Sequence, residues 1–521
     1  MSTTAEALEA CRALLGDDHV IVTDRARTLA AQDVYRSGAL PLAVLRPRST
    51  ADVVAIVRAA REARIALHVR GGGMSYTDAC TPRDRQSFVL DLRDLDRIRN
   101  LSVHDHTVTA EAGSTWAALD AALAPHGLRA KFWGPMSGAV ATLGGGFSQG
   151  AATFGSARHG SSASTALGFE VVLGDGRVLD TARSAAAQRD GFFRPYGPDL
   201  TGLFTGDAGA LGIKTAVTLQ LERRPGTKGS LTFAFDDFRS LRAAVSQLAR
   251  EGLATEIFGV ETALAKLAAG EAALTQDAAA LWGVMRAQGS LLAAARQGWR
   301  VARAGRGFLG GSHYLANVLC EARDARRLSL TLADVRGVLA PFGVEVANTM
   351  AAVVQSTPFP PPMVVGPHGM RLLPLHVILP HSAVDGFHEA FEVLRSAERE
   401  NLHKHRAHLF VVFAGTGEST LLYEPVIYWH DDWLPLHHET LPESMRAVLQ
   451  PGAPNLEGRA YVESLRVRLI DLMQAHGGAH LQIGRAYPYL RDRAASFVDL
   501  VRAIKRATDP DDLVNPGALG L

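Results

Sequence analysis

The chain has 521 residues, of which 47% are hydrophobic and 21% are charged, and its formal net charge is +1. These values are typical of a globular protein long enough for two or three domains, and they exclude a strongly basic nucleic-acid-binding surface. No apolar run is long enough to span a membrane, and Cys11, Cys80 and Cys320 are too scattered for a disulfide framework or a thiolate metal site.

The N-terminal part of the chain predicts alternating helices and strands. Residues 4–15 are rich in Ala, Leu and Glu and predict an amphipathic helix, and nothing at this end has the pattern of a secretory signal peptide. Leu42–Pro47 predicts a strand that ends at a proline. Ser49 or Thr50 can then cap a helix over Asp52–Ala63. We expect a cytoplasmic protein.

A turn with three consecutive glycines, Arg70–Asp78, lies between the apolar strands Ile65–Val69 and Phe88–Leu92. Glycine permits positive φ angles and lets backbone N–H groups approach another group closely. Such N–H groups, with Arg70 and Ser75 beside them, form a site for a phosphate or pyrophosphate. Taken alone, the turn is equally compatible with a tight bend that binds nothing.

The next segment predicts a strand at Val108–Gly113 and a helix at Trp116–Leu123, with Ser114 or Thr115 as its cap. A second glycine-rich block, Gly134–Gly150, follows. Its glycines are accompanied by few charged residues, so we expect a buried loop against a flat ligand or neighbouring strands.

The chain continues through Phe154–Gly160 to a strand at Gly168–Leu173 and a hairpin turn at Asp175–Gly176. A third glycine block, Leu203–Leu219, follows this hairpin. The elements up to Leu128, which precede the second glycine block, form a compact α+β unit.

Past Pro225 the pattern changes, which places a domain boundary near residue 225. We predict a helix over Leu264–Ala280, strands at Leu375–Leu379 and Leu409–Phe413, and a helix over Asp385–Asn401.

The three glycine blocks and the C-terminal Asn515-Pro516-Gly517, in this order and spacing, resemble one family. It is the FAD-linked oxidoreductases of the vanillyl-alcohol oxidase and p-cresol methylhydroxylase (PCMH) fold. The resemblance covers residues 40–225 and the tail from about residue 478. It implies a PCMH-type FAD-binding domain at 1–225, a substrate (cap) domain at 226–477, and a segment at 478–521 that returns to the FAD domain.

The resemblance also assigns residues to the FAD. The pyrophosphate would be bound by Arg70, Gly71, Gly72, Gly73, Met74 and Ser75. The isoalloxazine and ribityl chain would lie along Pro135, Met136, Ser137, Thr142, Leu143, Gly144 and Gly145. The same cofactor would be flanked by Ser156, Arg158, His159 and Gly160. Its adenine half would be held by Gly209, Gly212, Ile213 and Thr215, and Asn515 would reach back to the cofactor from the tail.

One position departs from the family pattern. Many members have a histidine where this chain has Met74, and that histidine forms a covalent bond to the flavin. A thioether cannot form this bond, residues 130–160 contain no cysteine, and His159 is a less suitable attachment point. We therefore expect non-covalently bound FAD.

The resemblance points to His480, Arg485 and Tyr487 as catalytic residues, because their segment is similar to the one that returns to the flavin in this family. Flavin chemistry needs a group that accepts a hydroxyl proton and positive charge near the flavin N1. His480 could serve as the base, Arg485 as the cation, and Tyr487 as a ligand of a substrate oxygen. The alternative is that all three are structural polar contacts at a domain junction.

A strand rich in aromatic residues, 423–432, is a further candidate for the substrate pocket. Glu424, Tyr428 or His430 could face the substrate, whereas we expect Trp429 to be a core residue. The cluster His403, His405 and His408 has no acidic partner at ligand spacing, and the stretch Phe413–Glu418 lacks the motif of the metal-dependent relatives. We expect no metal, and we place His437 and His438 on the surface.

The sequence therefore predicts an FAD-dependent oxidase or dehydrogenase that acts on a CH–OH group. The substrate is an aromatic (phenolic or benzylic) alcohol or a 2-hydroxy acid, and the electron acceptor is O2, a quinone or a cytochrome. A homodimer is compatible with the sequence, and we expect no nucleic-acid or membrane partner. Two alternatives stay open: a non-catalytic flavin-binding protein and a flavin-dependent reductase.

Overall fold

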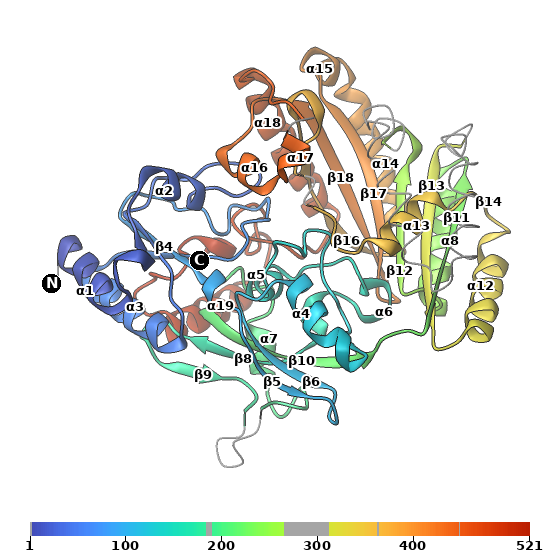
Figure 1. The fold of residues 1–521 in the computed structure, drawn as a ribbon. Helices are drawn as coiled ribbons and strands as arrows, with labels where there is room; N and C mark the ends of the chain where they lie inside the picture. Colours follow the sequence, from blue (N-terminus) through green and yellow to red (C-terminus); the bar gives the residue numbers. More distant parts are fainter. Residues whose placement is uncertain (1–2, 184–189, 265–311, 362–363, 447–448) are drawn as a thin grey trace.

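The computed structural model describes residues 3–183, 190–264, 312–361, 364–446 and 449–521. Within these ranges it contains three β-sheets (Figure 1). In this view the N-terminal sheet lies on the left, the second sheet lies at the bottom and the third lies on the right. Helices accompany all three sheets, and the two larger sheets are antiparallel, which confirms the predicted α+β class.

The first sheet has the strand order β1-β2-β4-β3. Strands β2 and β3 both run parallel to β4, so the chain needs a crossover between them. Helix α3 provides it, and the Ser49 hydroxyl caps this helix by accepting a hydrogen bond from the Asp52 N–H at 3.1 Å. Its elements are β1 (Val20–Ile21), β2 (Ala43–Leu45), β3 (Ala66–Arg70), β4 (Ser87–Asp91), α1 (Thr4–Leu15), α2 (Asp24–Ala30) and α3 (Thr50–Ala63).

The second sheet is antiparallel, with the order β5-β6-β10-β8-β9 and β7 paired to β10. The predicted helix at Trp116–Leu123 is confirmed as α4, capped by Thr115. The strands are β5 (Ile98–Ser102), β6 (Thr107–Glu111), β7 (Leu128–Ala130), β8 (Ala166–Val172), β9 (Val178–Asp180) and β10 (Ile213–Arg223). The helices here are α4 (Trp116–Leu123), α5 (Leu143–Gln149), α6 (Ser156–His159) and α7 (Leu200–Leu203).

The third sheet is also antiparallel, with the order β14-β11-β13-β12-β17-β18-β15 and β16 paired to β18. Its strands are β11 (Thr227–Phe235), β12 (Glu256–Glu261), β13 (Tyr314–Ala322), β14 (Val344–Val346), β15 (Met370–Pro374), β16 (Val377–Pro380), β17 (His408–Thr416) and β18 (Thr420–His430). Its helices are α8 (Phe238–Glu251), α12 (Ala325–Leu339), α13 (Thr349–Ser356), α14 (Val384–Ala397), α15 (Arg399–Lys404), α16 (Pro435–Thr440), α17 (Glu443–Arg446) and α18 (Leu456–Ala475).

Strands β17 and β18 present two different faces. Residues such as Val411, Phe413 and Tyr423 are buried in a core that they share with α8, α14 and α18. The alternating positions, which include Val412 and Glu424, are only partly buried and line a cavity on the opposite face. The sheet therefore directs one set of side chains toward the glycine-rich N-terminal part of the chain.

The sheet changes between β10, which ends at Arg223, and β11, which begins at Thr227. After α18 the chain leaves the third sheet and forms α19 (Ala495–Thr508). It then pairs with β3 of the first sheet: Leu67 N–H donates to Leu513 O at 2.7 Å, and Asn515 N–H donates to Leu67 O at 2.8 Å.

The structure corrects two boundaries. The helix predicted over Asp385–Asn401 is divided into α14 and α15 near Glu398, and the strand predicted at Leu375–Leu379 begins only at Val377. Most of the helix predicted over Leu264–Ala280 lies outside the described residues. Among the described residues, no helix combines the length and apolar character needed to cross a bilayer.

Candidate functional site

The triple-glycine turn lies where β3 ends, at the carboxyl edge of the parallel strands. Its glycines are required by close packing, since a Cβ at Gly71 would clash with the Thr142 hydroxyl and one at Gly72 with the Val140 carbonyl oxygen. Gly73 also has a φ of +70°. The first and second glycine blocks are therefore in direct contact.

This turn presents free backbone donors. Among the described residues, the N–H groups of Gly72, Gly73, Met74 and Ser75 donate no hydrogen bond to another part of the protein. Gly73 is buried and the other three residues are half-buried beside a cavity, so this row of unpaired N–H groups suits an acceptor supplied by a ligand. A pyrophosphate is such an acceptor.

The turn borders an open cavity of about 920 Å³, a volume that includes the solvent at its mouth. Residues from all three glycine blocks and from the tail line it. The predicted cofactor residues among them are Arg70, Gly71, Gly72, Gly73, Met74, Ser75, Pro135, Ser137, Thr142, Gly144, Gly145, Gly209, Gly212 and Asn515.

Asn515 connects the tail to two of these loops. Its side-chain oxygen accepts a hydrogen bond from Val69 N–H at 2.8 Å, and its side-chain amide donates to Ala208 O at 3.1 Å. A Cβ at Gly209 would lie 2.6 Å from the same amide nitrogen. The side chain thus connects the end of β3 to the third glycine block.

Several predicted cofactor residues lie elsewhere. Met136 and Ser156 line a second cavity, Arg158 is exposed, and Gly160 ends α6. The His159 Nε2 lies 3.3 Å from a carboxylate oxygen of Glu222.

Leu143 is buried in the hydrophobic core and does not line the first cavity. The remaining two, Ile213 and Thr215, are buried in β10. The Thr215 hydroxyl donates a hydrogen bond to the Glu170 carboxylate at 2.7 Å. Neither residue lines the first cavity.

Lys214 lines the first cavity and was not among the predicted residues. Its Nζ lies 2.6 Å from Asp207 Oδ1, and both side chains are buried. Burial lowers the pKa of Lys214 and raises that of Asp207, while the attraction between the two groups opposes both shifts. A single lysine within the apolar run of β10 was the sequence signal for this cation.

A second open cavity, of about 1040 Å³ including the solvent at its mouth, lies between the glycine-rich N-terminal part and the third sheet. Gln482 lines both cavities, and Met136 of the second cavity stands between Pro135 and Ser137 of the first. The second cavity is lined by Met136, Ala152, Thr153, Phe154, Ser156, Glu256, Phe258, Val354, His376, Val412, Ala414, Gly415, Thr416, Leu422, Glu424, Leu481 and Gln482.

Glu424 directs its carboxyl group into this second cavity from β18. It makes no hydrogen bond or ion pair within the described part of the chain, and burial raises its pKa to about 7. Tyr76 and Tyr428 lie near it. Burial is the main cause of the raised pKa of both phenols, and the charge of Glu424 raises each pKa further. Neither hydroxyl is hydrogen-bonded to another described residue.

Glu256 and His376 also line the second cavity and were missed by the sequence reasoning. The Glu256 carboxyl group accepts hydrogen bonds from the N–H groups of Gly155 (3.0 Å) and Ser156 (3.2 Å), and burial raises its pKa well above the usual range. The His376 Nε2 accepts hydrogen bonds from Leu481 and Gln482 N–H, both at 3.0 Å, and burial lowers its pKa to about 3. His376 is therefore a neutral side chain that fixes the backbone beside Gln482.

The predicted catalytic residues His480, Arg485 and Tyr487 all lie near this junction. The Arg485 guanidinium donates hydrogen bonds to the carbonyl oxygens of Asp78 and Thr81 and to the Thr81 hydroxyl, the last at 2.7 Å. The segment from Asp78 to Thr81, at the end of the triple-glycine turn, thus accepts the hydrogen bonds of the Arg485 guanidinium.

Tyr487 and His480 pack together, with ring centroids 4.0 Å apart. The buried Tyr487 hydroxyl accepts a hydrogen bond from His376 N–H at 2.9 Å. The His480 Nδ1–H donates to His376 O at 2.8 Å, while its Nε2 is buried and unpaired within the described residues. Burial lowers the pKa of His480 to about 4.

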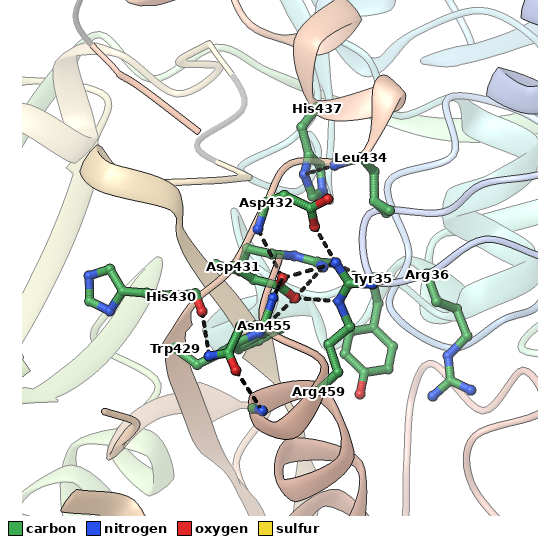
Figure 2. A network of polar contacts seen from close by, with 12 residues as sticks. Tyr35, Arg36, Trp429, His430, Asp431, Asp432, Leu434, His437, Asn455 and Arg459 are labelled. Carbon is green, nitrogen blue, oxygen red and sulfur yellow. Dashed lines mark hydrogen bonds and ion pairs between the residues drawn. The ribbon is translucent and has the colours of Figure 1, made fainter. Parts of the chain in front are cut away.

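A polar cluster around Asp431 joins the third sheet to the N-terminal segment (Figure 2). Asp431 is fully buried and accepts hydrogen bonds from Arg459 at 2.6 and 2.9 Å and from Asn455 N–H at 2.8 Å. Arg371 lies 3.3 Å from the same carboxylate and donates a further hydrogen bond to Tyr35 O. Figure 2 shows His430 pointing away from this cluster.

The surface position predicted for His437 is wrong. The side chain is fully buried, because its Nε2 donates to Val34 O at 2.9 Å and its Nδ1 accepts from Leu434 N–H at 3.1 Å. Trp429, predicted as a core residue, is buried. His405 stacks on Tyr461, and in the described ranges no three His, Cys, Asp or Glu side chains are grouped to hold a metal ion.

The first cavity fits FAD. Unpaired N–H groups at the glycine turn suit its pyrophosphate, and the side-chain-free glycines leave space for a long ligand.

Comparison with known proteins agrees with this reading. Residues 41–182 match the FAD binding domain family. A probable mitochondrial D-lactate dehydrogenase of Danio rerio is 30% identical over 245 residues, which are 46% of this chain and 48% of that protein. Glycolate oxidase subunit GlcD of Bacillus subtilis is 26% identical over 211 residues, 40% of this chain and 43% of that one. The chain thus matches about half the length of these relatives.

Among solved structures, p-cresol methylhydroxylase with substrate bound has a TM-score of 0.70 at 16% identity, covering 99% of this chain and 96% of that one. At this identity the likeness establishes the fold, and it extends over both cavities.

Proposed function

We propose that the chain is an FAD-linked oxidoreductase of the vanillyl-alcohol oxidase and p-cresol methylhydroxylase fold and that it oxidises a CH–OH group of a small molecule. The observation that carries this proposal is the second cavity, which adjoins the FAD cavity at Gln482 and contains the unpaired carboxyl group of Glu424. FAD supplies the acceptor for the hydride that leaves the substrate carbon.

The residues of the first cavity hold and orient the cofactor. The N–H groups of Gly72, Gly73, Met74 and Ser75 are free to bind the pyrophosphate, and Asn515 fixes the adjoining loops. Gly71 and Gly144 keep the second glycine block close to β3 and β6, because a side chain at either position would collide with its neighbour.

Glu424 is the base that we propose for the substrate hydroxyl proton. A carboxyl group with a pKa of about 7 is half ionised near neutral pH, where it is able to accept this proton. The hydroxyls of Tyr76 and Tyr428 lie near Glu424 but do not line the second cavity, so we assign them no contact with the substrate.

We assign positioning roles to His480, Arg485 and Tyr487. Arg485 holds the carbonyl groups that follow the glycine turn, and Tyr487 holds the backbone of His376. The contact of His480 with His376 O supports the same assignment.

The substrate is an aromatic (phenolic or benzylic) alcohol or a 2-hydroxy acid. The names of the related proteins, D-lactate dehydrogenase and glycolate oxidase, favour the acid, whereas p-cresol methylhydroxylase favours the aromatic compound. The electron acceptor is O2, a quinone or a cytochrome.

The test is an anaerobic screen of alcohols, hydroxy acids and phenols against the FAD-loaded protein. We expect at least one compound to bleach the flavin absorbance. If none does, the chain binds flavin without this activity.

With an active substrate, the rate of flavin reduction should rise as the pH increases through about 7, because Glu424 must lose its proton to act as a base. Glu424→Gln should lower the rate about 10²- to 10⁴-fold and remove this pH dependence. Glu457→Gln, at an exposed position of α18, is the control and should leave both unchanged. An unchanged pH profile in Glu424→Gln would show that another group accepts the proton of the substrate hydroxyl.

We further propose that the FAD is non-covalent, because the cavity residue Met74 has no nucleophilic nitrogen or thiol. Precipitation of the protein with acid should leave the yellow flavin in the supernatant. Flavin that remains in the pellet would contradict this.

A further inference from the structure

We propose that the second cavity selects uncharged hydroxyl compounds and excludes anionic ones, and that Glu424 is the residue that makes this selection. The inference rests on the proposed function, since it narrows the substrate class of the same site. It separates neutral alcohols from both 2-hydroxy-acid anions and phenolates.

The first argument is the charge of the lining. Among the described residues that line the cavity there are two carboxyl groups, Glu256 and Glu424, and no lysine or arginine. His376 is held neutral, because its Nε2 accepts two backbone hydrogen bonds. A carboxylate or phenolate substrate would therefore meet no compensating cation from these residues.

The second argument is the isolation of Glu424. Its pKa is raised by burial alone, with no cation close enough to oppose the shift. Two like charges in a poorly hydrated space repel strongly, so an anion could enter only if Glu424 took up a proton. An uncharged alcohol carries no such penalty, and its hydroxyl group can donate a hydrogen bond to the carboxylate.

Arg371 and Arg485, from neighbouring elements, do not change this balance. Arg371 lowers the pKa of the Tyr76 phenol, but this effect is smaller than those of burial, Tyr428, Glu424 and Asp33. Its guanidinium is already engaged by Asp431 and by Tyr35 O. Arg485, predicted from the sequence as the cation for a substrate carboxylate, is occupied by the carbonyl groups of Asp78 and Thr81.

The walls of the cavity fit the same class of compound. Phe154, Phe258, Val412 and Leu422 give it an apolar surface, while the Thr416 hydroxyl is neutral. Apolar walls with a few polar groups are typical of sites for small organic molecules.

The experiment measures binding of matched pairs to the FAD-loaded protein at pH 8.5, where Glu424 is ionised. The pairs differ only in charge: benzamide and benzoate, mandelamide and mandelate, lactamide and lactate. Binding is followed by the perturbation of the oxidised flavin spectrum, which requires no turnover. We expect at least one amide to bind, and to bind at least tenfold more tightly than its acid.

Glu424→Gln removes the charge and keeps the shape of the side chain. In this variant, the affinity for each excluded acid should come to within about threefold of the affinity for its amide. Glu457→Gln should preserve the difference in affinity. The proposal is wrong if no amide perturbs the flavin, if an acid binds as tightly as its amide, or if Glu424→Gln leaves the discrimination unchanged.

These outcomes separate the inference from the proposed function. Amides that bind selectively without any compound reducing the flavin would contradict the proposed oxidation and leave the charge selection standing. If lactate or mandelate reduces the flavin and the amides bind no more tightly than the acids, the proposed oxidation would stand and the charge selection would be contradicted.

Discussion

Single residues decide the chemistry of this site, and Glu424 is the most informative of them. Burial raises the pKa of its carboxyl group from 4.5 to about 7. A raised acid pKa means that the folded state holds the proton more tightly than the unfolded state. The contribution to stability is thus fully present below pH 4.5 and is lost as the pH rises toward 7.

Glu424→Gln should therefore be more stable than the wild type at pH 8 and similar to it at pH 4. The gain at pH 8 is at most about 3 kcal/mol, from about 1.4 kcal/mol per pKa unit. Denaturant unfolding at both pH values measures it. An equal effect at the two pH values would show that Glu424 has an ordinary pKa.

The glycine at position 71 is a second decisive residue. A Cβ there would displace the Thr142 hydroxyl, which caps α5. Gly71→Ala should therefore weaken FAD binding by about tenfold or more, which is about 1–3 kcal/mol of packing strain. Titration of the apoprotein with FAD measures this loss.

Gly337→Ala is the matched control. This glycine lies in α12 with open space around its Cα, so alanine should stabilise the protein by about 0.5–1 kcal/mol and leave FAD affinity unchanged. Equal FAD affinity in both variants would contradict the packing argument.

Among the elements, α18 has the clearest influence on the cofactor site. Its buried residue Arg466 donates to Tyr76 O at 3.1 Å and lies 3.6 Å from Asp78. Its Glu463 accepts a hydrogen bond from the Tyr35 hydroxyl at 2.8 Å. A helix of the third sheet therefore holds the loop that follows the triple-glycine turn.

Arg466→Met should destabilise the protein by about 3–5 kcal/mol, because it leaves buried acceptors without their partner. It should also weaken FAD binding, since the Tyr76–Asp78 loop loses its anchor. Thermal unfolding with and without FAD, together with FAD titration, measures both. Arg502→Met, at an exposed position of α19, should change neither. A stable Arg466→Met variant with normal FAD affinity would show that the Tyr76–Asp78 loop keeps its conformation without Arg466.

At the scale of the whole molecule, the Asp431 cluster joins the third sheet to the N-terminal segment. Burial raises the pKa of Asp431, but hydrogen bonds from Arg459 and from backbone N–H groups outweigh it and lower the pKa overall. A lowered acid pKa stabilises the fold above the usual Asp pKa, so this contribution persists between pH 5 and pH 8.

Asp431→Asn should cost about 3–5 kcal/mol at pH 7, because it leaves the buried Arg371 without its counter-charge. The cluster connects both parts of the chain, so calorimetry should give one unfolding transition, which FAD shifts upward as a whole. Two transitions, of which only one responds to FAD, would show that the parts unfold independently.

The sequence was most informative about the backbone. The glycine blocks, the caps Ser49 and Thr115, and the α+β class follow from local rules that act over a few residues, and the structure confirms them. The spacing of Glu424 and Tyr428 also implies a common face of a strand.

Contacts between side chains from distant segments could not be predicted from the sequence. Arg485 contacts residues some four hundred positions away, and Val34, which accepts a hydrogen bond from His437, lies about as far from it along the chain. Lys214, Glu256 and His376 were missed for the same reason, because their role arises only where separate loops meet.

The contact between the C-terminal tail and β3 has a consequence for synthesis. β3 and the triple-glycine turn emerge early from the ribosome, whereas Val514 and Asn515, which complete the cavity wall, emerge about four hundred and forty residues later. At about 5–20 residues per second, the cofactor loops wait for tens of seconds before their last partner arrives. Final closure around FAD is therefore a late event in the life of the nascent chain.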